Sequence, residues 1–158
     1  MDFSEITDGV LRGLEEWEPV LARLDEETVS ERRNSQNRNI RQILGHMADS
    51  ASNNTHRIIH LQYQKSPFSF PNYAINGNND RWIAIQNYSQ ENWNDLIMLW
   101  KYLHLHLAHV IRNVDNSRLD NEWIAGPDEG NVSLKDMIND FLRHFRLHLD
   151  EIQELTDL

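Results

Sequence analysis

The sequence predicts an all-α protein, a four-helix bundle that forms one domain over residues 1–158. Four long segments repeat apolar residues with helical spacing, and no segment shows a convincing strand alternation. No repeat or low-complexity linker divides the chain. A length of 158 residues is usual for one domain and is sufficient to bury a hydrophobic core.

The first two predicted helices run from about Phe3 to Asp25 and from about Ile40 to Gln64. In each segment, apolar residues recur every three or four positions, which places them on one face of a helix. Pro19 lies inside the first segment, where a proline kinks or divides a helix. The two apolar faces consist of Ile6, Val10, Leu14, Trp17, Leu21 and Leu24, and of Ile40, Ile43, Leu44, Met47, Ala51, Ile58 and Leu61.

The third predicted helix runs from about Gln90 to Val114 and the fourth from about Leu134 to Leu155. The fourth has the clearest start signal in the chain. Ser133 is the predicted N-cap, and Asp136 stands at the acidic position of a capping box. These residues fix where the helix begins and therefore the direction in which each of its side chains points.

Three long polar connections separate the helices, at residues 26–39, 66–88 and 115–132. The segment 66–88 is rich in proline, glycine and asparagine and is expected to be an irregular crossover between the second and third helices. Connections this long are uncommon in small domains and often border a functional site.

Composition narrows the chemistry that the chain can perform. There is no cysteine, which excludes disulfides, thiolate catalysis and cysteine-ligated zinc and leaves histidine and carboxylate side chains as metal ligands. The formal charge of −10 argues against a nucleic-acid partner. The one local basic cluster is expected to be a solvated loop and helix start. It consists of Arg32, Arg33, Arg38 and Arg41.

No apolar run approaches the ~20 residues of a membrane span, so no membrane partner is expected. The N-terminus is acidic and lacks the basic start of a signal peptide, which favours a cytoplasmic protein. The large aromatic residues are expected to pack in the core rather than line a pocket. They are Trp82, Trp93, Trp100 and Trp123.

A pair of histidines in the fourth predicted helix, His144 and His148, is the strongest functional signal. Residues four apart stand on the same face of a helix, so the two imidazoles can bind one metal ion. His148 lies about 50° and His144 about 90° from the centre of the apolar face, on the same side. The pair is therefore expected to face a cleft between helices, although two boundary histidines without a ligand have the same spacing.

The second helix contains a rival pair and a better third ligand. His56 and His60 have the same spacing but lie roughly 150–170° from the apolar centre, so they are expected to point at water. His46 lies about 110° from that centre, on a flank from which it can turn toward a neighbouring helix. His104, His106 and His109 of the third helix are expected to be ordinary surface or boundary residues.

Helical phase thus combines His46 with His144 and His148 in one predicted metal site. Three imidazoles and one open position are the arrangement of a catalytic zinc site. All-nitrogen ligation also suits nickel, iron and copper. Zinc or nickel is the first expectation for the single divalent ion, with iron or manganese next.

At these residues the chain resembles the DinB/YfiT-like superfamily of metal-dependent four-helix-bundle proteins. The segment Asn39 to Ser50 is similar to that family's second-helix motif, in which a lone histidine follows an aliphatic-rich turn. The segment from Ser133 through His144 and His148 resembles its fourth helix. The order of helices also fits, so the resemblance spans essentially the whole chain. Many relatives carry a second histidine directly beside a fourth-helix ligand, and this chain does not.

The resemblance implies a bundle that binds one divalent metal through His46, His144 and His148. It also implies a homodimer that acts on a small-molecule substrate. Relatives include metal-dependent hydrolases, enzymes that transfer low-molecular-weight thiols such as bacillithiol, and isomerases that use mycothiol. Because the chain has no cysteine, any thiol would come from outside it.

Three functions remain open at this stage. The metal site could activate water or a thiol, as in a hydrolase or a thiol S-transferase. The bundle could instead be a non-catalytic metal-binding or sensing module acting through a dimer, or a structural bundle without metal. For the enzyme, Asn53 is expected to line the substrate pocket. Asp140 and Glu151 are expected to accept hydrogen bonds from the ligand histidines, unless they are merely exposed helical carboxylates.

Overall fold

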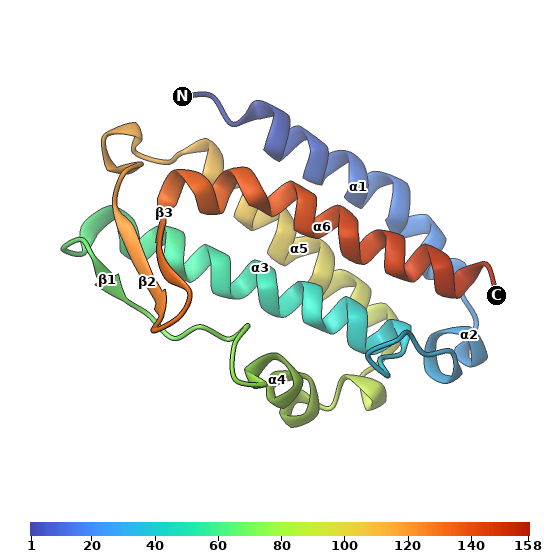
Figure 1. Ribbon diagram of the computed structural model, residues 1–158. Coiled ribbons are helices and arrows are strands. Elements are labelled where there is room, and N and C mark those ends of the chain that lie inside the picture. Colours follow the sequence, from blue (N-terminus) through green and yellow to red (C-terminus); the bar gives the residue numbers. More distant parts are fainter.

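The computed structural model describes residues 1–158 and shows four long helices lying side by side (Figure 1). Two shorter helices and three short strands occupy the connections between them. In chain order the elements are α1 (Ser4–Arg23), α2 (Glu26–Glu31), α3 (Ile40–Tyr63), β1 (Phe68–Ser69), α4 (Asn78–Gln86), α5 (Trp93–Arg112), β2 (Glu122–Gly126), β3 (Gly130–Ser133) and α6 (Leu134–Thr156).

Side-chain caps define where the two site-bearing helices, α3 and α6, begin. The Asn39 side chain accepts a hydrogen bond from the Gln42 backbone, and the Gln42 side chain accepts one from the Asn39 backbone. This reciprocal pair satisfies two N–H groups that the first turn of a helix leaves free. The hydroxyl of Ser133 accepts from the backbone N–H of Asp136 at 3.1 Å, as predicted. Helix α1 continues through Pro19 without a break.

The four long helices form a closed ring of contacts, in which α3 and α1 each pack against both α5 and α6. In Figure 1, α1 and α6 run in one direction and α3 and α5 in the other. Helices α3 and α5 therefore lie parallel, and the segment between them returns along the length of the bundle. Helices α3 and α6, distant in sequence, are antiparallel neighbours, and the candidate site lies between them.

The hydrophobic core is one continuous cluster of 31 buried residues to which all four long helices contribute. Trp100 of α5 is completely buried and stacks on Phe145 of α6, with ring centroids 6.4 Å apart. Burial of apolar side chains of this size stabilises the fold by about 1.5–3 kcal/mol each. No helix combines the length and the apolar character needed to cross a lipid bilayer.

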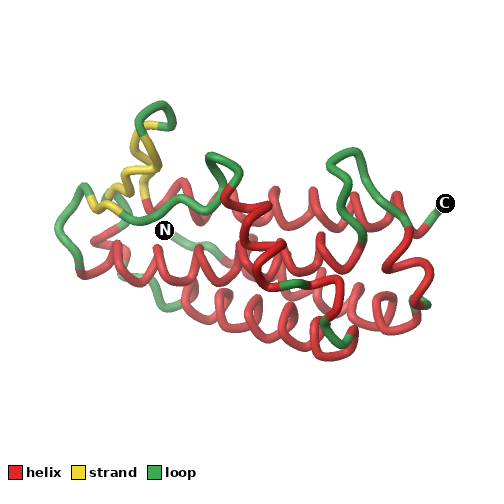
Figure 2. Tube along the Cα trace, turned by 90° about the horizontal axis from the view of Figure 1, so that it is seen from below, coloured by secondary structure: helices red, strands yellow, loops and turns green.

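Three short strands in the connections were not predicted from the sequence. Strand β1 pairs in parallel with β2, and β2 pairs antiparallel with β3, with Trp123 of β2 opposite both Phe68 and Val132. The sheet lies at the end of the bundle where α6 begins (Figure 2). Its strands are two to five residues long. Alternation over so few residues is hard to distinguish from irregular structure.

Part of the basic cluster also differs from its prediction. Arg38 and Arg41 are each only 5% exposed instead of being solvated. Arg38 pairs with Asp80 at the start of α4, and Arg41 pairs with Glu26 of α2 and donates to the backbone oxygen of Glu91. The two arginines tie the connections 26–39 and 66–88 to the beginning of α3.

Candidate metal centre

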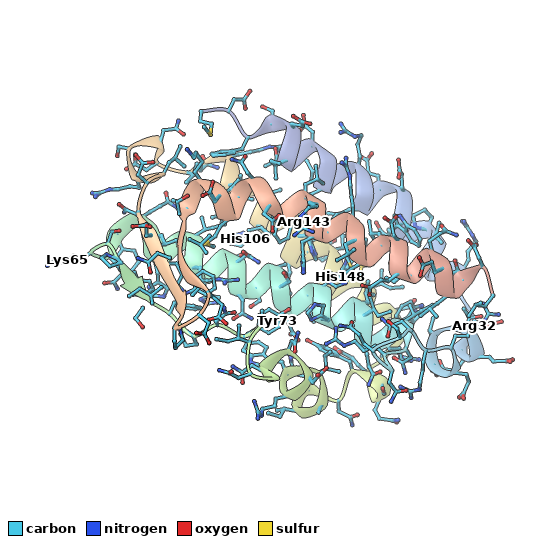
Figure 3. The ribbon with its side chains drawn as sticks, in the orientation of Figure 1. Arg32, Lys65, Tyr73, His106, Arg143 and His148 are labelled. Carbon is cyan, nitrogen blue, oxygen red and sulfur yellow. The ribbon has the colours of Figure 1, made fainter.

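The structure brings His46 of α3 together with His144 and His148 of α6. One ring nitrogen from each of these three histidines lies within 4.8 Å of the others. The ring centroid of His148 is 4.6 Å from that of His46 and 4.5 Å from that of His144. Figure 3 shows His148 between α6 and α3. No other group of three histidine or carboxylate side chains converges in this way.

The spacing of the two α6 histidines fits a shared metal ion. The Nε2 atoms of His144 and His148 are 3.3 Å apart. Two nitrogens bound to one tetrahedral ion at about 2.0–2.1 Å lie about 3.3–3.4 Å from each other. These residues therefore fit the divalent metal that the sequence implied, with the paired Nε2 atoms and a ring nitrogen of His46 as the donors.

Tyr73, from the connection between α3 and α5, holds the imidazole of His46. Its Oη lies 3.0 Å from His46 Nδ1 and 3.2 Å from the His46 carbonyl oxygen. Both contacts are satisfied when the Tyr73 hydroxyl donates to the carbonyl and Nδ1–H donates to Oη. This assignment leaves the lone pair of His46 on Nε2, which is the state required for binding a metal through that nitrogen.

The two predicted carboxylate partners behave differently. Glu151 Oε2 lies 3.4 Å from His148 Nδ1, so it is placed to hold the proton on that nitrogen and leave Nε2 free. Asp140 instead forms a bidentate pair with Arg143, at 2.7 Å and 3.1 Å, and has no hydrogen bond to a histidine. Both carboxylates line the cavity, but only Glu151 contacts a histidine of the cluster.

His46 and His144 are held in their neutral form. The pKa of His46 is lowered to about 2, mainly by burial and in part by the neighbouring His148 and Arg38. Burial lowers the pKa of His144 to about 4, again with a contribution from His148. Neutral imidazole is the form that binds a metal, so protons compete little with a metal at these two residues near pH 7.

The three histidines line a cavity of about 440 Å³ between α3, α6 and the sheet. Cavities of about 300–1,000 Å³ are typical of small-molecule sites. Its polar wall includes Ser50, Asn54 and Arg57 of α3. Asn53, which was predicted to line the pocket, does not line it. The Asn53 side chain turns back along α3 and donates to the Asp49 carbonyl at 2.9 Å.

The remaining histidines of α3 and α5 do not join the cluster. His56 is exposed, as predicted, but His60 is half-buried and stacks on Phe68 with centroids 5.2 Å apart, so the prediction that it points at water was wrong. His104 was predicted to be a surface or boundary residue and is instead 1% exposed. Its Nδ1 lies 2.6 Å from the carbonyl oxygen of Trp100.

The sequence analysis did not predict that three residues belong to the site. Tyr73 lies in an irregular connection, where no periodicity indicates the direction of a side chain. Trp123 packs in the core, as predicted, and also forms part of the cavity wall. Arg57 follows His46 by eleven residues, which is close to three full turns, so its position on the same face was readable from helical phase.

Comparison with solved structures identifies similar folds. The chain is similar to YfiT from Bacillus subtilis, described as a probable metal-dependent hydrolase with an unusual four-helix bundle topology, with a TM-score of 0.77 and 18% identity over 96% of this chain and 86% of that one. It is also similar to a mycothiol-dependent maleylpyruvate isomerase, with a TM-score of 0.73 and 15% identity. That match covers 94% of this chain and 59% of the isomerase. These identities establish the likeness of fold alone.

Sequence comparison gives the family itself. No curated protein matches the chain. The model of the DinB superfamily matches residues 11–152, a range that includes α3 and α5 completely, most of α1 and α6, and the three clustered histidines. The chain therefore belongs to the DinB superfamily.

Proposed function

We propose that this protein is a metal-dependent enzyme that holds one divalent ion through His46, His144 and His148 and acts on a small molecule. The observation that carries the proposal is the convergence of three imidazoles, two of them buried and that of His144 half-buried, on the wall of a 440 Å³ cavity. Core histidines do not require an adjoining cavity, whereas a catalytic metal site needs an open position that a substrate can reach.

A divalent ion bound there would lower the pKa of a water molecule or thiol and polarise a substrate carbonyl. The residues of the chain would supply orientation. Tyr73 and Glu151 keep the protons of His46 and His148 on Nδ1, and the cavity admits the substrate from the open side of the cluster. We propose zinc or nickel as the first candidates for the ion, and iron or manganese next.

We propose two reaction classes, guided by the solved neighbours, which are described as a probable metal-dependent hydrolase and a mycothiol-dependent isomerase. The first class is hydrolysis of an ester or amide. The second is transfer of a low-molecular-weight thiol, which must be an external co-substrate because this chain has no cysteine. We further propose that the protein works in the cytoplasm as a homodimer, for which light scattering should give twice the chain mass of 18.7 kDa.

The test uses protein purified without a histidine tag, so that all bound metal belongs to the chain. Metal content after dialysis and calorimetric titration with zinc and nickel measure the site. Turnover of p-nitrophenyl esters, and of bromobimane with an added thiol, separates hydrolysis from thiol transfer. We expect one ion per chain and turnover in at least one assay, both lost together in His148→Ala.

His56→Ala is the matched control, because His56 is an exposed histidine on α3, outside the cluster. It should retain full metal content and activity. Full metal occupancy in His148→Ala would contradict the three-histidine site. A fully loaded protein that turns over neither class of substrate would favour the non-catalytic binding module.

A further inference from the structure

Arg57 of α3 is a buried arginine without a carboxylate partner. Three arginines are at most 7% exposed: Arg38, Arg41 and Arg57. The first two form ion pairs with acidic side chains, and Arg57 forms none. Burying a charge without a counter-charge is costly, so an unpaired buried guanidinium is a feature that calls for a physical explanation.

The contacts of Arg57 hold its guanidinium in place without neutralising it. Nε donates to the Asn53 carbonyl at 3.4 Å, and the central carbon lies 4.0 Å from the ring centroid of Trp123. The indole of Trp123 is itself fixed, because its Nε1 donates to the Phe70 carbonyl at 2.9 Å. Neither Nη atom of Arg57 has a hydrogen-bond partner in the protein, and Arg57 lines the site cavity.

The guanidinium shares this cavity with the three histidines. Arg57 and His46 lie eleven residues apart on α3, which places them on the same face. The side chain of Arg57 leans back one turn to the level of Asn53, so its guanidinium stands roughly 10 Å from His46 along the helix axis. One small molecule can therefore reach both groups at once.

The carboxylates around the cavity lie on α6 and do not neutralise Arg57. Asp140 is paired with Arg143, and Glu151 contacts His148. Asp136 is exposed in the first turn of α6. Burial lowers the pKa of Arg57 only to about 10, so the guanidinium remains charged at neutral pH.

We propose that Arg57 binds an anionic oxygen group of the substrate, a carboxylate or a phosphate, while the reacting end of the substrate lies at the three histidines. The planar guanidinium is suited to both groups, because its N–H donors match the spacing of their oxygens. The proposal rests on the proposed function and adds the class of substrate: an anion whose charge lies about 10 Å from the bond that reacts.

Thiol probes on cobalt-loaded protein test this idea without requiring turnover. Mercaptoalkanoic acids of increasing chain length are titrated against the corresponding neutral amides, and the thiolate-to-cobalt absorption band reports binding at the metal. We expect the wild type to bind the acid of optimal length at least about tenfold more tightly than its amide, as for a charge-assisted pair. A mercaptoalkyl phosphonate of the same length distinguishes a phosphate from a carboxylate.

Arg57→Gln should abolish the preference for the acid while leaving the affinity of the amide unchanged. Arg57→Lys, which keeps the charge and the packing on Trp123, should retain part of the preference. Arg146→Gln is the control, because Arg146 is an exposed arginine of α6 that does not line the cavity. It removes the same charge and should keep the full preference.

Several outcomes would overturn the proposal: equal affinity of the wild type for acid and amide, full preference in Arg57→Gln, or loss of the preference in Arg38→Gln instead. Failure of the proposed function has a different signature, which is absence of the cobalt spectrum in the wild type. In that event, hexanoate and hexanamide are titrated into metal-free protein with tryptophan fluorescence as the readout. Hexanoate binding that Arg57→Gln removes supports the anion site, and its absence refutes it.

Discussion

His104 of α5 and two histidines of the cluster between α3 and α6, His46 and His148, are buried to similar extents but have different surroundings. His104, His46 and His148 are 1%, 4% and 5% exposed. His104 packs among aromatic rings, with its centroid 5.1 Å from that of Phe145, and donates to a backbone carbonyl of its own helix. The α3–α6 histidines converge on one another and line a cavity, and two of them are oriented by Tyr73 and Glu151.

Burial by itself therefore does not identify a metal ligand. Burial lowers the pKa of His104 to about 4, the same value as for His144. The distinguishing features are geometric: convergence of several ring nitrogens, partners that orient His46 and His148, and access to a cavity.

Removing one of the metal-binding histidines should have the largest effect on zinc affinity. We expect His148→Ala to weaken zinc binding by more than about a hundredfold, because loss of a supporting partner alone typically costs 10–100-fold. His104→Asn should bind zinc like the wild type, since Asn keeps the donor to the Trp100 carbonyl. Calorimetry with a competing chelator measures both. A large loss of zinc affinity in His104→Asn would contradict the conclusion that His104 is not part of the metal site.

Acid should destabilise the His104 region next most strongly. The unfolded chain protonates His104 below its ordinary pKa of 6.5, whereas the folded chain does so only near 4. Stability is therefore intact above pH 6.5 and is lost as the pH falls toward 4. Between pH 7 and pH 5 the wild type should lose about 2 kcal/mol more than His104→Asn. Urea denaturation of metal-free protein at each pH gives the difference, and equal losses would contradict this explanation.

Tyr73→Phe should weaken metal binding by about tenfold, because it removes the acceptor for His46 Nδ1–H. Tyr63→Phe is a close control. The Tyr63 hydroxyl lies 2.8 Å from Nδ1 of His60, a histidine outside the cluster, so this variant should keep the wild-type affinity. Equal affinities of the two variants would show that Tyr73 does not position His46.

The smallest expected change in zinc affinity distinguishes Glu151 from Asp140, the two carboxylates of α6 that were predicted to contact the ligand histidines. Glu151→Gln should reduce zinc affinity a few-fold, since a neutral amide oxygen is a weaker acceptor for His148 Nδ1–H. Asp140→Asn should change it by less than about twofold, because Asp140 is engaged with Arg143. A larger loss for Asp140→Asn than for Glu151→Gln would reverse the assignment of partners.

The long helices of the bundle and the three histidines of the candidate site were predictable from local sequence. The long helices recur within a few residues of their predicted bounds, because apolar spacing and caps such as Ser133 act over one or two turns. Helical phase also selected His46, His144 and His148 from eight histidines, since phase is set by the helix and not by its partners. Phase failed for Asn53, whose side chain turned to its own backbone.

The sequence by itself determined the helices, the faces they present and the membership of the three histidines in one candidate site. Only the tertiary structure decided what surrounds that site. Tyr73 and Trp123 lie in segments without helical periodicity. The role proposed for Arg57 depends on the absence of an acidic partner, which only the packed structure reveals. The physical reason is that local spacing fixes the direction of a side chain along its own helix. Which residues meet across a cavity depends on packing between segments far apart in the chain.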